Sequence, residues 1–173
     1  MKAFRLVLFV ALLPLAALAQ SDATTLTKVG DKLPDFSFEI EKGKKVNIND
    51  YQGKLVLINF FATWCSPCNM ELDLMKDKFW KKYKDNPKFA FLVFGREEGW
   101  DILDPFKEKK GFTFPMLPDL DRSIFKQFAT QSIPRNVIAD ENGKIIYQSV
   151  GFSEKGFGEM LKFIEQRLEK MAK

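Results

Sequence analysis

Residues 55–68, LVLINFFATWCSPC, are the stretch that decides how this chain folds. The first half is almost continuously apolar, which is typical of a strand buried on both faces of a sheet. The second half contains both cysteines of the chain, Cys65 and Cys68. Apolar side chains then recur at helical spacing over residues 67–83. The sequence therefore predicts a buried strand that leads directly into a helix, with the cysteine pair at the junction.

The residue types at this junction suit thiol chemistry. Cys65 stands at the expected start of the helix, where free backbone N–H groups and the helix dipole stabilise a thiolate. Pro67 fits the first helical turn, where a missing N–H costs nothing. One turn further on, Cys68 is expected to be more buried and to resolve a mixed disulfide formed by Cys65. Trp64, Ser66 and Pro67 would then line the surface that receives a substrate.

The alternative for the cysteine pair is a structural disulfide, which exported proteins commonly carry. Such bonds stabilise more when they close long loops, and this one would enclose only two residues. The chain contains no histidine, which excludes Ser-His-Asp and Cys-His nucleophiles and c-type haem attachment. Two sulfur ligands without imidazole do not make a zinc site. We therefore expect no metal, and no cofactor other than a redox-active Cys65–Cys68 disulfide.

The first 19 residues have the pattern of a secretory signal peptide. Two basic residues precede an apolar run over residues 6–19, and Ala17-Leu18-Ala19 forms a small-residue cleavage site before Gln20. A transmembrane anchor is the alternative, but a spanning helix needs roughly 20 apolar residues. We therefore expect an exported protein that is periplasmic and soluble after cleavage.

The remainder is expected to form a tail and one domain. Residues 20–28 are polar and Thr-rich, which predicts a flexible tail, and residues 29–173 suffice for one domain with its own core. Removing Lys2 and Arg5 with the signal peptide lowers the basic residues from 27 to 25, against 23 acidic residues. Such a near balance argues against a nucleic-acid partner.

Further along the chain, alternation and turn residues predict additional strands and helices. The expected elements are a hairpin over residues 36–48, a strand at 89–94, a helix at 100–110, an extended segment at 112–117, a short helix at 122–129, strands at 137–139 and 144–150 around an Asn-Gly turn, and a helix at 154–170. Strands that alternate with helices and close with a hairpin indicate a mixed sheet with helices on both faces.

The cysteine motif and its surroundings resemble the thioredoxin superfamily, and within it the exported group related to TlpA and ResA. The resemblance covers residues 29–173, and it is carried by GDKLPDF (30–36), VLINFFATWC (56–65), Ile133-Pro134 and DENGKI (140–145). It implies a thioredoxin-like three-layer α/β sandwich, with a mixed central sheet, helices on both faces and an added N-terminal β-hairpin. It also implies dithiol–disulfide exchange.

The resemblance assigns a role to the Ile133-Pro134 pair. Pro134 matches the cis-proline of the superfamily, which lies beside the cysteines, and the preceding residue, Ile133, offers backbone hydrogen bonds to a bound substrate chain. Without the resemblance, a trans-proline in a plain turn would be the expectation. Relatives often have Thr after this proline, where this chain has Arg135, so an acidic or anionic feature on the substrate is a further expectation.

Two polar residues near the cysteines also acquire roles from the resemblance. Glu71 lies three residues after Cys68, where the TlpA/ResA-like group has an acid that could exchange a proton with the buried thiol; a solvated helix glutamate is the alternative. Asp73 replaces a proline common in that group. Asn59 stands where thioredoxin has a buried proton-transferring Asp. Because an amide does no acid–base work, we expect Asn59 to give structural support by hydrogen bonding.

The resemblance favours a reductase of protein disulfides, with a membrane thiol transporter as electron donor and cytochrome c maturation as one role. An oxidase or isomerase would share the site and differ in reduction potential. A thiol peroxidase is a further alternative, although the peroxiredoxin pattern places Thr where Ala62 stands. The last alternative is a non-catalytic binding module that uses the groove near Pro134. The sequence leaves the direction, the partner proteins and the oligomeric state open.

Overall fold

The computed structural model describes residues 22–172, so the expected signal peptide lies outside the described residues. Five strands form a mixed sheet in the order β5-β4-β3-β6-β7, and two more form a separate antiparallel hairpin. The strands are β1 (Ser37–Glu41), β2 (Lys44–Asn47), β3 (Leu55–Phe61), β4 (Phe89–Arg96), β5 (Met116–Asp119), β6 (Arg135–Ala139) and β7 (Ile145–Val150). β3, β4 and β5 run parallel, and β6 and β7 each pair antiparallel with their neighbours.

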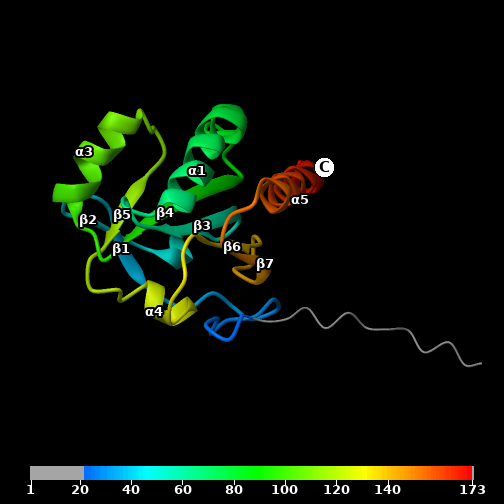
Figure 1. Cartoon of the computed structure of the whole chain (residues 1–173). Helices are drawn as coiled ribbons and strands as arrows, with labels where there is room; N and C mark the ends of the chain where they lie inside the picture. Colours follow the sequence, from blue (N-terminus) through cyan, green and yellow to red (C-terminus); the bar gives the residue numbers. More distant parts are fainter. Residues whose placement is uncertain (1–21, 173) are drawn as a thin grey trace, which may run out of the picture.

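Helices cover both faces of this sheet (Figure 1). They are α1 (Ser66–Met75), α2 (Lys81–Tyr83), α3 (Trp100–Lys110), α4 (Phe125–Phe128) and α5 (Glu154–Met171), with a short 3-10 helix at Ile48–Tyr51. One apolar cluster joins α1, α3 and α5 to the sheet, and a second joins α4 and the β1–β2 hairpin to the opposite face. The predicted α/β sandwich with its added N-terminal hairpin is confirmed.

The central strand β3 separates these two clusters. All seven of its residues are buried, and the period of two in a strand sends alternate side chains to opposite faces. Leu57 and Phe61 belong to the cluster under α1 and α5, whereas Ile58 and Phe60 belong to the cluster over α4. Between Leu57 and Phe61, the same alternation directs Asn59 toward α1.

The helix predicted over residues 67–83 forms with one irregularity. α1 continues through a π-helical turn at Lys76–Trp80 into α2, and Phe79 of that turn is fully buried. Its ring packs against Tyr83 and Phe89 at centroid distances of 4.6 and 5.4 Å. No helix within residues 22–172 has the length and apolar character to cross a membrane.

Within the segment predicted as a flexible tail, residues 24–26 make backbone contacts with the domain. The backbone N–H of Leu26 donates to the carbonyl of Phe128 at 2.8 Å, and that of Thr130 donates to the carbonyl of Thr24 at 2.9 Å. Thr25 forms an isolated bridge with Ala129. Polar composition suggested a loose segment, but these hydrogen bonds attach it to the residues that follow α4.

Candidate active site

The two cysteines form a disulfide at the N-terminus of α1. Cys65 is the N-cap residue, and its sulfur accepts a hydrogen bond from the backbone N–H of Cys68 at 3.3 Å. Cys65 is 6 % exposed and Cys68 is fully buried. The helix thus directs a backbone donor at the sulfur nearer to solvent, which is the geometry that stabilises a thiolate there after reduction.

The residues beside Cys65 form an exposed rim. Trp64 is 70 % exposed, and the guanidinium carbon of Arg96 lies 5.9 Å from the centroid of its ring. Ser66 and Pro67 are exposed as well. A large aromatic side chain left in solvent next to a reactive sulfur is available for contact with another molecule.

The Ile133–Pro134 peptide bond is cis. It directly precedes β6, whose first residue, Arg135, pairs with Phe60 near the end of β3. The loop therefore lies beside the strand end that leads to the cysteines. The carbonyl of Pro134 accepts a hydrogen bond from the backbone N–H of Gly151 at 2.8 Å, and Ile133 is half-buried.

Glu71 is buried on the same side of α1 as Cys68, one turn away. It is only 3 % exposed. The side-chain nitrogen of Asn136 donates to its Oε1 at 2.6 Å, and that of Asn59 donates to its Oε2 at 3.4 Å. Burial raises the pKa of Glu71 from 4.5 to about 7, while these two hydrogen bonds oppose part of the rise. Near neutral pH, this carboxyl group is therefore able both to accept and to release a proton.

The donors to Glu71 belong to a polar row that crosses three strands. Asn59 of β3 pairs in register with Asn136 of β6, which pairs with Ser149 of β7. The Asn59 side-chain nitrogen donates to Asn136 Oδ1 at 2.8 Å, and Asn136 donates more weakly to Ser149 Oγ at 3.4 Å. Asn136 and Ser149 were missed by the sequence analysis; a polar residue at the start of an otherwise apolar strand was the available signal for Asn136.

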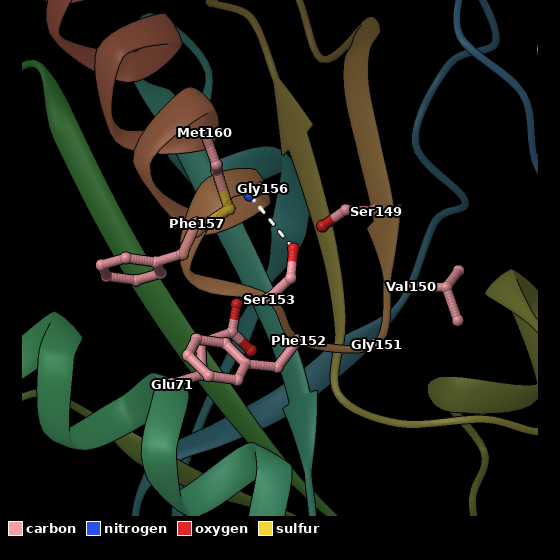
Figure 2. A pocket seen from close by; sticks show the side chains of 9 residues that line it. All are labelled: Glu71, Ser149, Val150, Gly151, Phe152, Ser153, Gly156, Phe157 and Met160. Atoms are coloured by element: carbon pink, nitrogen blue, oxygen red, sulfur yellow. Dashed lines mark hydrogen bonds between the residues drawn. The ribbon is translucent and has the colours of Figure 1, made fainter.

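A cavity of about 250 Å³ opens beside Glu71. Figure 2 shows the Glu71 side chain reaching from α1 toward the loop that joins β7 to α5. Ser149, Phe152 and Met160 contribute to the walls. Ser153 caps α5 through a 3.1 Å hydrogen bond from the backbone N–H of Gly156, which fixes one side of the opening. Glu71 and Ser149 thus face space that is large enough for water.

The backbone just before the cysteines is held by Glu98. This carboxylate is 4 % exposed and accepts hydrogen bonds from both the backbone N–H and the hydroxyl of Thr63, at 2.9 and 2.6 Å. The Asn69 side chain donates to the Thr63 carbonyl at 2.9 Å. Every polar group of Thr63 therefore has a partner. The sequence analysis missed Glu98, because only the fold brings residues 63 and 98 together.

Arg135 does not face a substrate, so the expectation that it recognises an anionic feature is wrong. Its side chain is 1 % exposed. The guanidinium donates to the hydroxyl of Thr25 at 2.6 Å and to Asp22 at 3.1 Å. Alternation along β6 sends this side chain to the α4 face of the sheet, away from the side that holds Glu71.

The sheet order, the Cys-x-x-Cys disulfide at a helix N-terminus and the adjacent cis-proline define a thioredoxin-like thiol–disulfide oxidoreductase. The chain belongs to the AhpC/TSA family, whose model matches residues 29–148. It is 35 % identical to the thioredoxin-like protein YneN of Bacillus subtilis, over 81 % of this chain and 78 % of that protein. It is 28 % identical to the thiol-disulfide oxidoreductase ResA of Bacillus anthracis, over 74 % and 73 %.

Solved structures agree with this assignment. A Bacteroides thetaiotaomicron protein provisionally assigned as a protein disulfide isomerase superposes with a TM-score of 0.80 at 30 % identity, covering 84 % of this chain and 93 % of that one. StoA from Bacillus subtilis superposes with a TM-score of 0.63 at 18 % identity, over 76 % and 97 %, and supports the fold alone. The predicted enzyme class, protein disulfide oxidoreductase, is confirmed.

Proposed function

We propose that this protein is an exported reductase of protein disulfides. The observation that carries the direction is the buried carboxyl of Glu71, one helical turn from Cys68 and partly ionised near pH 7. A negative charge at this position disfavours the reduced, thiolate-bearing pair and so favours a low reduction potential. The intervening residues, Ser66 and Pro67, bring no cation that would oppose this effect.

The proposed cycle transfers two electrons in two exchanges. The Cys65 thiolate attacks the substrate disulfide, which forms a mixed disulfide and releases one substrate thiolate. Glu71 then takes the proton of the Cys68 thiol, and the Cys68 sulfur displaces the second substrate sulfur from Cys65. The proton passes on to the departing thiolate. The substrate is reduced to a dithiol, and the Cys65–Cys68 disulfide is restored.

The surface around the pair supports a polypeptide substrate. In the proposed complex, the substrate chain lies against Trp64, Ser66 and Pro67 and pairs with the backbone of Ile133 beside Pro134. Asn59 acts as support, through its hydrogen bonds to Glu71 and Asn136. Electrons enter from a membrane thiol transporter, and no group other than the disulfide carries them. Proteins of cytochrome c maturation are one proposed class of substrate, in the periplasm.

A measured reduction potential tests the direction. Equilibration of the purified protein with mixtures of reduced and oxidised dithiothreitol should give a potential below about −220 mV, in the range of cellular reductants. A value near about −120 mV, where strong oxidants lie, would reverse the assignment. A Cys68→Ser variant should trap mixed disulfides on Cys65, whereas the double variant Cys65→Ser with Cys68→Ser should trap none.

Disulfide isomerisation is a second candidate, because the Bacteroides thetaiotaomicron neighbour is provisionally assigned that activity. An isomerase leaves the substrate with the same number of disulfides, whereas a reductase lowers it. Incubation of the reduced protein with a scrambled disulfide protein separates the two. Recovery of native pairing without net thiol release would favour isomerisation, and net thiol release would favour the reductase.

A further inference from the structure

Arg135 holds the N-terminal segment of the domain through several hydrogen bonds. Beyond its bonds to Thr25 and Asp22, the guanidinium donates to the hydroxyl of Thr24 at 2.9 Å and to the backbone carbonyl of Gln131 at 3.0 Å. Asp22 is its one ion-pair partner within residues 22–172. A buried guanidinium requires such hydrogen-bond acceptors and a counter-charge, because an unpaired charge in the interior is costly.

The segment that Arg135 holds, residues 22–26, is called the strap here. Its backbone pairs with residues 128–130. These belong to residues 128–131, called the connector, which lead from the end of α4 toward the cis-proline. The connector has irregular backbone, which must find hydrogen-bond partners outside regular secondary structure. Arg122 supplies one more, by donating to the Thr130 carbonyl at 2.7 Å. The strap therefore supplies two of the backbone hydrogen bonds that hold the connector.

Arg135 joins this support to the substrate loop. It directly follows Pro134, and its guanidinium contacts both the strap and the connector carbonyl of Gln131. Through Arg135, the strap and the connector are therefore joined to the residue that lies two positions after Ile133. In addition, the hydroxyl and the N–H of Thr24, together with Arg135, hold the pKa of Asp22 below its ordinary range, so the ion pair persists to lower pH than an unperturbed aspartate would allow.

We propose that Arg135 and the strap are positioning elements of the substrate site, which fix the backbone of Ile133 for pairing with an extended polypeptide. This inference rests on the proposed function, in which that backbone binds the substrate chain. Neither Arg135 nor Asp22 touches the sulfurs. Loosening them should therefore impair reactions that need main-chain pairing and spare those that need only an accessible Cys65 sulfur.

An Asp22→Asn variant tests this, with two disulfides as probes. Insulin presents a polypeptide chain, and hydroxyethyl disulfide presents none. With the fully reduced protein, we expect the rate constant for insulin to fall about tenfold, mainly through a higher KM, while that for hydroxyethyl disulfide stays within about twofold. Asp22→Glu, which keeps the carboxylate, should recover most of the insulin rate. Asp31→Asn is the matched control, because within residues 22–172 the Asp31 side chain hydrogen-bonds only locally, to the backbone N–H of Lys28.

The outcomes separate the inference from the proposed function. Equal losses with both disulfides, or no loss with either, would overturn the role of the strap. A wild-type protein that reduces hydroxyethyl disulfide but not insulin would instead contradict the proposed function. Hydrogen exchange at the Thr130 amide, which bonds to Thr24, should accelerate in Asp22→Asn and not in Asp31→Asn. Unchanged exchange there would also count against the strap, since the connector would then be held without it.

Discussion

The Asn136 side chain of β6 donates a 2.6 Å hydrogen bond to the Glu71 carboxyl of α1. This bond links the strand that follows the cis-proline to the helix that begins at the cysteines. Both residues are buried, at 1 % and 3 % exposure. The acid beside Cys68 is therefore held by the sheet itself, and its protonation depends on amide groups contributed by β3 and β6.

Replacing Glu71 by Gln should make the protein relatively more stable as pH rises. The folded state binds the Glu71 proton more tightly than the unfolded chain, so stability from this group falls as pH rises from 4.5 through about 7. At about 1.4 kcal/mol per pKa unit, the free energy of unfolding that Glu71 contributes at low pH and loses at high pH amounts to about 3 kcal/mol. Urea unfolding of Glu71→Gln and wild type across that range checks this. Glu169 is exposed, and Glu169→Gln should show no such trend. If the difference in free energy of unfolding between Glu71→Gln and wild type did not change with pH, the raised pKa of Glu71 would be contradicted.

The same substitution should alter the pH profile of the resolving step. If Glu71 takes the Cys68 proton, release of substrate from a preformed Cys65 mixed disulfide should depend on pH with an inflection near 7 in wild type. Glu71→Gln should slow that release by about 10²-fold and remove the inflection. The initial attack by Cys65 should change far less. Stopped-flow measurement of each step separates them, and an unchanged inflection in the variant would assign the proton transfer elsewhere.

Removing the Asn136 side chain should move that inflection to higher pH. Asn136→Ala deletes the shorter of the two hydrogen bonds that oppose the rise in the pKa of Glu71. We expect an upward shift of about one unit in the pH profile of the resolving step. Ser149→Ala is the control, since Ser149 contacts Asn136 at 3.4 Å without bonding to Glu71. A downward shift would mean that the amide does not stabilise the carboxylate.

Loss of the Glu98 carboxylate should free the backbone before the cysteines. In Glu98→Ala, the N–H and hydroxyl of Thr63 lose their acceptor, at a cost of about 1–3 kcal/mol in the free energy of unfolding. The Cys65 thiolate, followed by its ultraviolet absorbance, should then titrate at a different pH, because the loop orients Cys65 at the helix terminus. Glu98→Gln keeps one acceptor and should recover part of both effects. Glu97→Ala, on the neighbouring exposed side chain, should reproduce neither.

Trp64→Ala should separate binding from stability. Because Trp64 is 70 % exposed, its removal should change the free energy of unfolding by no more than about 0.5 kcal/mol. Reduction of insulin should nevertheless slow severalfold through loss of contact area next to Cys65. Truncation of Leu120, equally exposed at 68 %, provides the comparison. Equal rates for wild type and Trp64→Ala would remove Trp64 from the substrate surface.

Local pattern was sufficient for the parts of the fold that one segment determines alone. The apolar run of β3 and the helical period after Cys68 placed the strand, the helix and the cysteines, and the same period placed Glu71 on the face of α1 that carries Cys68. Register between strands has no such local signature. Asn136 therefore went unnoticed, because its importance comes from lying opposite Asn59 across a ladder of antiparallel strands.

Contacts between distant segments account for the remaining differences. Arg135 looked like a substrate-facing cation because the sequence gives no sign that residues near position 22 return to cover it. Glu98 drew no prediction because its partner, Thr63, lies 35 residues earlier. Charged residues are mostly exposed, so the residue type alone predicts that Arg135 and Glu98 lie in solvent. Each is buried because distant segments of the folded chain supply its hydrogen-bond partners.

The contacts between Arg135 and the strap also determine how much of the N-terminal sequence the folded domain needs. The family match starts at residue 29, beyond Asp22, Thr24 and Thr25. A truncated protein cut at that boundary would keep both cysteines and every strand, yet it would lose the residues that cover the Arg135 guanidinium and the carboxylate of Asp22 that pairs with it. Recombinant versions meant for assays on large substrates should therefore start upstream of Asp22, and shorter ones should be judged by more than their reactivity with small reagents.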